Sequence, residues 1–163
     1  MTKLKHLFLL VCIAGCLTAC EKDFPVDNHD PIAQFTADTN AIRAFVTKNN
    51  IVTKKDNEFG VFYQIIEPGT GNVEYKSTTQ VTANYTGRLL DGTQFETNNG
   101  AKFAMGGLIG GWQIGIPLIQ KGGKIRLIIP SFYAYGNVKN GPVPANSVLD
   151  FTIEITDLQQ ATN

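Results

Sequence analysis

The first hydrophobic feature of the chain is a short apolar run over residues 7–14, which follows Lys3 and Lys5. Small residues continue the sequence up to Cys20. The run is too short to cross a bilayer as a helix, whereas a basic start followed by a short apolar segment is typical of an export signal. We therefore interpret residues 1–19 as a cleaved signal segment.

A polar stretch follows, and we interpret residues 20–37 as a tether. Pro25 and Pro31 lie in it, and a chain rich in prolines and polar residues favours an extended, solvated conformation. The charged tripeptide at residues 21–23 is compatible with a sorting signal, although a simple solvated linker explains the same composition.

Residues 38–50 have the spacing of an amphipathic helix. Three apolar side chains share one face of that helix: Ile42, Phe45 and Val46. Asp38 or Asn40 could cap its start, and the asparagine pair at 49–50 could end it. We expect this helix to dock on the folded domain, with a contact between two copies of the chain as the alternative. A charged connector completes the unit at residues 38–58.

From residue 59 the pattern becomes that of β-strands. Apolar runs or alternating apolar and polar residues mark four segments: 59–66, 81–86, 124–129 and 149–156. The sequence Leu-Asp-Gly-Thr at 90–93 predicts a hairpin turn, and a short helix should begin at Gly110 and be kept brief by Pro117. Residues 59–160 are therefore predicted to form an α+β domain. Its twisted antiparallel β-sheet wraps around one short helix and is preceded by the amphipathic helix.

Charge and reactive side chains exclude several functions. Basic and acidic residues both number 14, and without a basic block nucleic acid is not an expected partner. All cysteines lie within the first twenty residues, so no disulfide framework is expected. No histidine or cysteine follows residue 30, which argues against a cysteine nucleophile, a Ser-His-Asp triad and the usual zinc sites.

Four motifs place aromatic residues beside turns and loops. They are V-T-A-N-Y-T-G at 81–87, D-G-T-Q-F at 91–95, L-I-G-G-W at 108–112 and Y-A-Y-G at 133–136. In this order and spacing, the chain from residue 59 to residue 158 resembles the FKBP-type peptidyl-prolyl cis–trans isomerases. The resemblance implies a shallow pocket between the sheet and its short helix.

The resemblance also implies roles for individual residues. Those expected to act at the prolyl bond are Tyr85, Phe95, Glu96, Ile109, Trp112 and Tyr135. Those expected to bind the substrate around it are Leu108, Val143 and Phe151. Trp112 would form the floor, and the Ile109 N–H and Tyr135 hydroxyl would each bind a substrate carbonyl. The alternatives are a core tryptophan, aromatic residues that belong to an ordinary strand core, and a Tyr135 hydroxyl bonded to its own loop.

A pocket of this kind needs no cofactor or metal. Rotation about an X-Pro bond crosses a barrier of about 18–20 kcal/mol, because the planar amide is stabilised by resonance. The twisted transition state has less charge separation, so an apolar cavity penalises it less than the planar form. A preference of about 5–6 kcal/mol for the twisted form would accelerate rotation about 10⁴-fold.

The chain departs from the family pattern at several positions. Glu96 stands where the family usually has aspartate, and Ala101 where it often has an aromatic wall residue. The loop between Phe103 and Leu108 is short. Asp150 replaces a usual apolar residue, and strand alternation predicts that it points away from the core.

The end of the signal segment carries a second resemblance. Leu17-Thr18-Ala19-Cys20 resembles the lipobox of bacterial lipoproteins, which implies diacylation of Cys20 and a lipid-anchored protein of the cell envelope. The sequence Ile-Ala-Gly-Cys at 13–16 is a weaker match of the same kind. An ordinary cleaved signal with an incidental cysteine is the alternative.

Three functions agree with these observations. The first is an isomerase that accelerates X-Pro steps in the folding of exported proteins. The second is a noncatalytic module or chaperone that binds prolyl segments, and the third is a structural lipoprotein with a relic fold. The expected partners are proline-containing polypeptides, the membrane and rapamycin-type macrolides, while the choice between monomer and dimer stays open.

Overall fold

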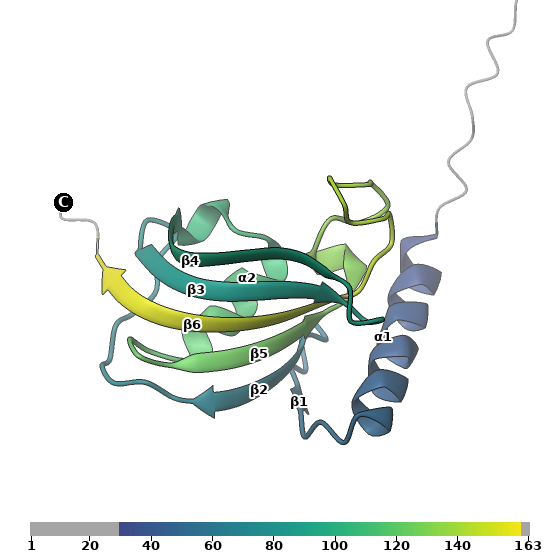
Figure 1. Cartoon of the computed structure of the whole chain (residues 1–163), viewed down its shortest axis with the longest axis horizontal. Coiled ribbons are helices and arrows are strands. Elements are labelled where there is room, and N and C mark those ends of the chain that lie inside the picture. The colour runs from purple at the N-terminus through teal and green to yellow at the C-terminus, as the bar shows by residue number, and fades with distance from the viewer. Residues whose placement is uncertain (1–29, 161–163) are drawn as a thin grey trace, which may run out of the picture.

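We analysed a computed structural model, which describes residues 30–160 (Figure 1). The predicted signal segment, Cys20 and the first part of the tether lie outside the described residues. Within residues 30–160, no helix is both long enough and apolar enough to cross a membrane.

The domain is built on one antiparallel sheet of six strands in the order β1-β2-β5-β6-β3-β4. The strands are β1 (Lys54–Lys55), β2 (Phe62–Glu67), β3 (Gln80–Leu89), β4 (Gln94–Ala104), β5 (Lys124–Ile129) and β6 (Leu149–Gln159). The helices are α1 (Pro31–Lys48) and α2 (Gly110–Gly115), with 3-10 turns η1 (Met105–Gly107), η2 (Ile116–Leu118) and η3 (Ser131–Tyr133). The predicted α+β class and its antiparallel sheet with one short helix are confirmed.

The long strands β3 and β6 form the centre of the sheet, and their alternation positions the site. Side chains that face α2 are buried, and they include Tyr85 on β3 and Phe151 and Ile153 on β6. The predicted hairpin turn joins β3 to β4, because the Leu89 N–H donates to the Thr93 carbonyl at 2.9 Å. Both strands therefore present their aromatic residues toward the same helix.

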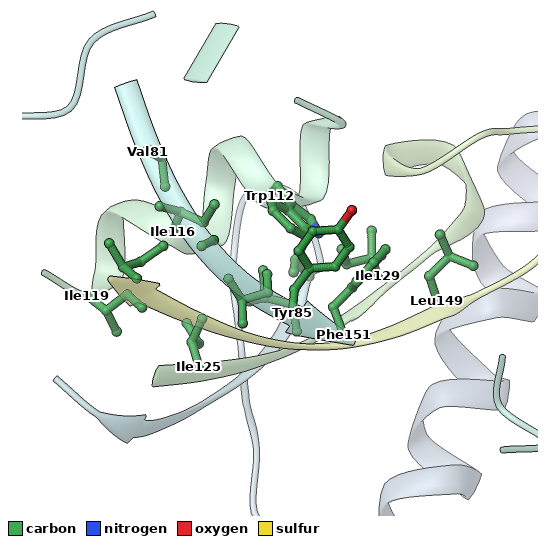
Figure 2. Packing of buried hydrophobic residues seen from close by; sticks show 14 of the residues in the cluster. Val81, Tyr85, Trp112, Ile116, Ile119, Ile125, Ile129, Leu149 and Phe151 are labelled. Carbon is green, nitrogen blue, oxygen red and sulfur yellow. The ribbon is translucent and has the colours of Figure 1, made fainter. Parts of the chain in front are cut away.

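Helix α2 packs very closely on the sheet and ends early, as Pro117 predicts (Figure 2). Gly111 and Gly115 face the sheet, and a Cβ at either position would overlap the side chains of Ile129 or Leu127. Glycine is therefore required where helix and strand meet. This close approach brings the Trp112 side chain against the central strands.

Helix α1 covers one end of the opposite face of the sheet. Its buried Ile42 packs with Phe62, Ile128 and Val148, and the half-buried Phe45 and Val46 join them. The expectation that this helix docks on the domain is confirmed.

The start of α1 differs from the prediction. The helix begins at Pro31 rather than at residue 38, so the last part of the predicted tether is helical. Asp30 caps it by accepting hydrogen bonds from the Ile32 and Ala33 N–H groups, and a proline suits the first helical turn because its N–H is not needed there. Neither Asp38 nor Asn40 is a cap, since both lie inside the helix. The end is as predicted, with Asn49 as the C-terminal cap.

Asp150 lies outside the core between the sheet and α2, as alternation predicted, but it is not exposed to solvent. It is 6 % exposed and forms a two-bond ion pair with Arg126, whose Nη2 lies 2.6 Å from Asp150 Oδ2. The Arg126 guanidinium also lies 5.9 Å from the centre of the Phe45 ring on α1. Asp150 is on the outer face, as expected, but α1 covers that face.

Candidate active site

A cavity of about 270 Å³ opens between α2, η1, the loop after η3 and the central strands. Nine residues line it: Tyr85, Glu96, Phe103, Gly107, Leu108, Ile109, Trp112, Tyr135 and Phe151. Seven of the nine predicted site residues are among them, from segments far apart in the sequence. The structure thus brings three of the four sequence motifs to one place, together with Glu96, which directly follows the fourth.

Trp112 forms the apolar base of this cavity. Its side chain is 3 % exposed and its ring meets those of Tyr85, Phe151 and Phe103 nearly edge to face, at centroid distances of 5.0, 5.2 and 5.8 Å. Figure 2 shows Tyr85, Trp112 and Phe151 converging from β3, α2 and β6. The Trp112 Nε1 is buried and has no hydrogen-bond partner within residues 30–160. Trp112 is thus both a core residue and part of the cavity lining.

Glu96 on β4 accepts a hydrogen bond from a side chain on the neighbouring strand β3. The Tyr85 hydroxyl donates to Glu96 Oε1 at 2.5 Å, which β3 and β4 permit because Gly87 is paired with Glu96. Burial, and then the hydrogen bond to Glu96, raise the pKa of Tyr85 well above its usual range. Tyr85 therefore stays protonated at neutral pH, and its hydroxyl orients the Glu96 carboxylate.

Ile109 stands at the start of α2 with an extended backbone. Its carbonyl accepts the N–H groups of Trp112 and Gln113 at 3.0 and 3.2 Å. Among residues 30–160, no hydrogen bond is found from the Ile109 N–H itself. The backbone at the cavity rim therefore has a donor available for a ligand, as the resemblance implied.

Tyr135 lies on the loop after η3, and its hydroxyl forms a hydrogen bond with the Asn140 side chain. Burial, and then the negative charge of Glu96, raise the pKa of Tyr135. Because the hydrogen bond with Asn140 lowers the pKa of Tyr135, the Asn140 amide donates it and the Tyr135 oxygen accepts it. The Tyr135 O–H can therefore still donate to a substrate carbonyl.

The two remaining predicted residues, Phe95 and Val143, lie at a neighbouring cavity. It has a volume of about 280 Å³ and shares Glu96 and Tyr135 with the first. The Phe95 ring meets Phe151 edge to face at 5.5 Å, so it supports the lining of the first cavity without being part of it. The nine predicted residues thus surround two adjoining cavities.

Sequence reasoning missed Phe103 as a site residue. The motif match placed a wall residue of the pocket at Ala101, but Phe103 lines the cavity and Ala101 does not. Both residues lie on the same side of the register shift in β4, where Ala101 pairs with Ala83 and Phe103 with Val81. Phe103 follows Ala101 by two residues and therefore shares its face of β4, which is the signal that could have found it.

Among residues 30–160, no group of three or more His, Cys, Asp or Glu side chains could hold a metal ion. The chemistry available to the site is therefore apolar burial, a backbone donor, tyrosine hydroxyls and one carboxylate.

Comparison with known proteins agrees with this geometry. The family model described as FKBP-type peptidyl-prolyl cis-trans isomerase matches residues 71–156. That match covers more than half of the chain and contains all nine predicted site residues. The chain belongs to the family of FKBP-type peptidyl-prolyl cis–trans isomerases.

Individual relatives support the same assignment. The chain is 39 % identical over 111 residues to the FKBP-type isomerase FkpA of Escherichia coli K12, an alignment that covers 66 % of this chain and 41 % of FkpA. It thus spans about two fifths of that relative. The crystal structure of E. coli FkpA matches with a TM-score of 0.69 and 32 % identity over 82 % of this chain and 62 % of that one. A peptidyl-prolyl isomerase from Pseudomonas syringae matches with a TM-score of 0.65 and 28 % identity over 82 % of this chain and 98 % of that one.

Proposed function

We propose that this chain catalyses cis–trans isomerisation of X-Pro bonds in polypeptides. The observation that carries the proposal is the cavity above Trp112, which combines an aromatic base with hydrogen-bonding groups at its rim. Membership of the isomerase family over residues 71–156 supports the same activity.

The cavity would lower the barrier to rotation about the X-Pro bond by removing the amide from water. A proline ring placed against Trp112 puts its amide among the rings of Tyr85, Phe103 and Phe151, where water cannot stabilise the planar, charge-separated form. The twisted amide loses less on leaving water, so binding favours it. The Ile109 N–H and the Tyr135 hydroxyl orient the flanking carbonyls, and Glu96 holds the Tyr85 hydroxyl.

The direct test is exchange spectroscopy on a short peptide with a single X-Pro bond, with the full chain present in small amounts. We expect the rotation rate of the bound peptide to rise by about four orders of magnitude, which corresponds to about 5–6 kcal/mol. A rapamycin-type macrolide should compete with the peptide and change the fluorescence of Trp112, the only tryptophan. Exchange no faster than in buffer would refute the isomerase.

One observation favours a second candidate, a noncatalytic module that binds prolyl segments. Glu96 stands where the family usually has aspartate, so the carboxylate at the cavity is one methylene longer than in the family pattern. This candidate predicts that the peptide binds and competes with the macrolide while its exchange rate stays at the value in buffer. The same experiment therefore separates the two functions.

We further propose that the chain is exported, anchored in the cell envelope by a lipid on Cys20, and active on exported polypeptides. Leu17-Thr18-Ala19-Cys20 and the apolar run before it support this proposal. Cys20→Ser should abolish labelling by a fatty acid and release the protein from the membrane fraction, whereas Cys16→Ser should do neither. Undiminished labelling of Cys20→Ser would contradict the anchor.

A further inference from the structure

Asp38 is a buried carboxylate on α1, and the proposed isomerase reaction does not use it. It is 3 % exposed, and its Oδ2 accepts hydrogen bonds from the Ser131 N–H at 2.8 Å and the Ser131 Oγ at 2.6 Å. Its Oδ1 accepts a third from Gln34 Nε2 at 2.7 Å. A buried carboxylate costs free energy unless it is hydrogen-bonded, so losing these partners would be unfavourable. The contact therefore fixes Ser131 to α1.

Ser131 connects Asp38 to a loop of the cavity through its backbone carbonyl. Its carbonyl accepts the N–H groups of Ala134 at 2.9 Å and Gly136 at 2.8 Å. These residues stand on either side of Tyr135, whose hydroxyl lines both cavities. An unbroken series of hydrogen bonds thus runs from Asp38 to the two neighbours of Tyr135.

Helix α1 also contacts the cavity rim through a second residue, Tyr133. The Phe35 ring on α1 and the Phe59 ring both meet the Tyr133 ring edge to face, at 6.4 and 5.9 Å. Tyr133 in turn lies against the start of α2, since a Cβ at Gly110 would be 3.2 Å from the Tyr133 Cδ1. Gly110 directly follows Ile109. Helix α1 therefore supports the backbone on both sides of the cavity rim.

We propose that Asp38 is a positioning residue for the isomerase site, which acts through Ser131 by holding the loop that presents Tyr135. The inference rests on the proposed function. Helix α1 lies before residue 71, where the match to the family model begins, so the contact joins the matched region to a segment outside it. A loop held only by its own residues would sample more conformations and lose Tyr135 from the cavity part of the time.

The test begins with Asp38→Ala in the full chain, with kcat and KM measured separately on a peptide with one X-Pro bond. We expect kcat/KM to fall about five- to tenfold while circular dichroism shows a folded domain. The matched control is Asp30→Ala. It removes the cap of the same helix, but within residues 30–160 the Asp30 side chain bonds only to the Ile32 and Ala33 N–H groups, so kcat/KM should stay within about twofold. An equal loss in both variants would overturn the proposal.

A double-mutant cycle with Tyr135→Phe separates positioning from general stability. If Asp38 acts through Tyr135, Asp38→Ala should cost less than about threefold in the Tyr135→Phe background. The same loss in both backgrounds would overturn the proposal. If Asp38→Ala does not fold, Ser131→Ala takes its place in the cycle, because it removes only the Oγ donor and should show the same suppression.

Amide hydrogen exchange tests the contact without any activity. In Asp38→Ala the Ala134 and Gly136 amides should exchange faster than in the wild-type chain and in Asp30→Ala. Unchanged protection of these two amides would overturn the proposal. A wild-type chain without isomerase activity would instead refute the proposed function, and exchange would still decide whether Asp38 orders the loop.

Discussion

The two faces of the sheet are each covered by a helix, but the two interfaces differ in kind. Under α2 a cluster of aromatic rings joins the aliphatic contacts, and a cavity remains open beside it. Under α1 the contacts are mainly aliphatic, and both carboxylates, Asp38 and Asp150, are paired. Polar groups paired inside the fold are structural, whereas donors left at an apolar cavity are available to a ligand.

The two faces of the sheet therefore have different roles. The α2 face provides the environment that favours a twisted prolyl amide. The α1 face provides stability, and through Ser131 it also orders one loop of the site. Substitutions under α2 should therefore change activity most, and substitutions under α1, apart from Asp38, should change stability most.

The largest effect on activity is expected for Trp112→Ala. The substitution removes the base of the cavity, so kcat/KM should fall about 100-fold or more. Truncating a buried aromatic residue also lowers the free energy of unfolding by about 3–5 kcal/mol. Peptide exchange and urea denaturation measure the two losses, and Trp112→Phe, which retains a ring, should lose less of both. Full activity in folded Trp112→Ala would remove Trp112 from the account.

On the other face, Arg126→Ala should lower stability without lowering activity. It leaves the Asp150 carboxylate buried and without its guanidinium partner, which should cost about 3 kcal/mol in the free energy of unfolding. The control is Lys121→Ala, which breaks the exposed pair with Asp157 and should cost less than about 1 kcal/mol. If kcat/KM of folded Arg126→Ala dropped as far as that of Trp112→Ala, the division between the faces would be wrong.

A smaller loss is expected for Tyr135→Phe, which removes one hydroxyl and keeps the ring. One hydrogen bond to the substrate is worth about 1–2 kcal/mol, so kcat/KM should fall roughly tenfold. A change below twofold would mean that the hydroxyl serves its own loop alone.

The tyrosines also predict the response to pH. Burial raises the pKa of Tyr85 and Tyr135, so both stay protonated in the folded chain at pH values where unfolded tyrosine, with a pKa of about 10, ionises. Activity should therefore be constant between about pH 6 and 9. The unfolded chain releases these protons first, so their contribution to stability is complete below about pH 10 and is lost as the pH rises through the folded values. Urea denaturation should show a smaller alkaline loss in Tyr85→Phe, and an equal loss would contradict this assignment.

The sequence predicted what local pattern determines and missed what depends on distant segments. The faces of β6 followed from alternation, and the short length of α2 followed from Pro117. Asp150 was placed on the correct face, but alternation cannot reveal that another helix covers it. Pro31 suggested a tether because prolines favour extended chain, yet after Asp30 it suits a helix start.

The site shows the same division. Its nine predicted residues came from motifs, and the structure gathers them around two adjoining cavities. Phe103 was missed because the motif match placed the wall position at Ala101 alone, although Phe103 lies two residues later on the same face of β4. The role of Asp38 depends on a partner, Ser131, that lies 93 positions away in the sequence.

The central claim is that the cavity accelerates rotation by removing the prolyl amide from water, and Glu96→Gln tests it most directly. A glutamine has the same shape and can still accept the Tyr85 hydroxyl, but it carries no charge and cannot take up a proton. We expect kcat/KM, measured by peptide exchange with the full chain, to stay within about threefold of the wild-type value. A loss of several hundredfold in a variant that circular dichroism shows to be folded would contradict the claim, because Glu96 would then take part in the chemistry.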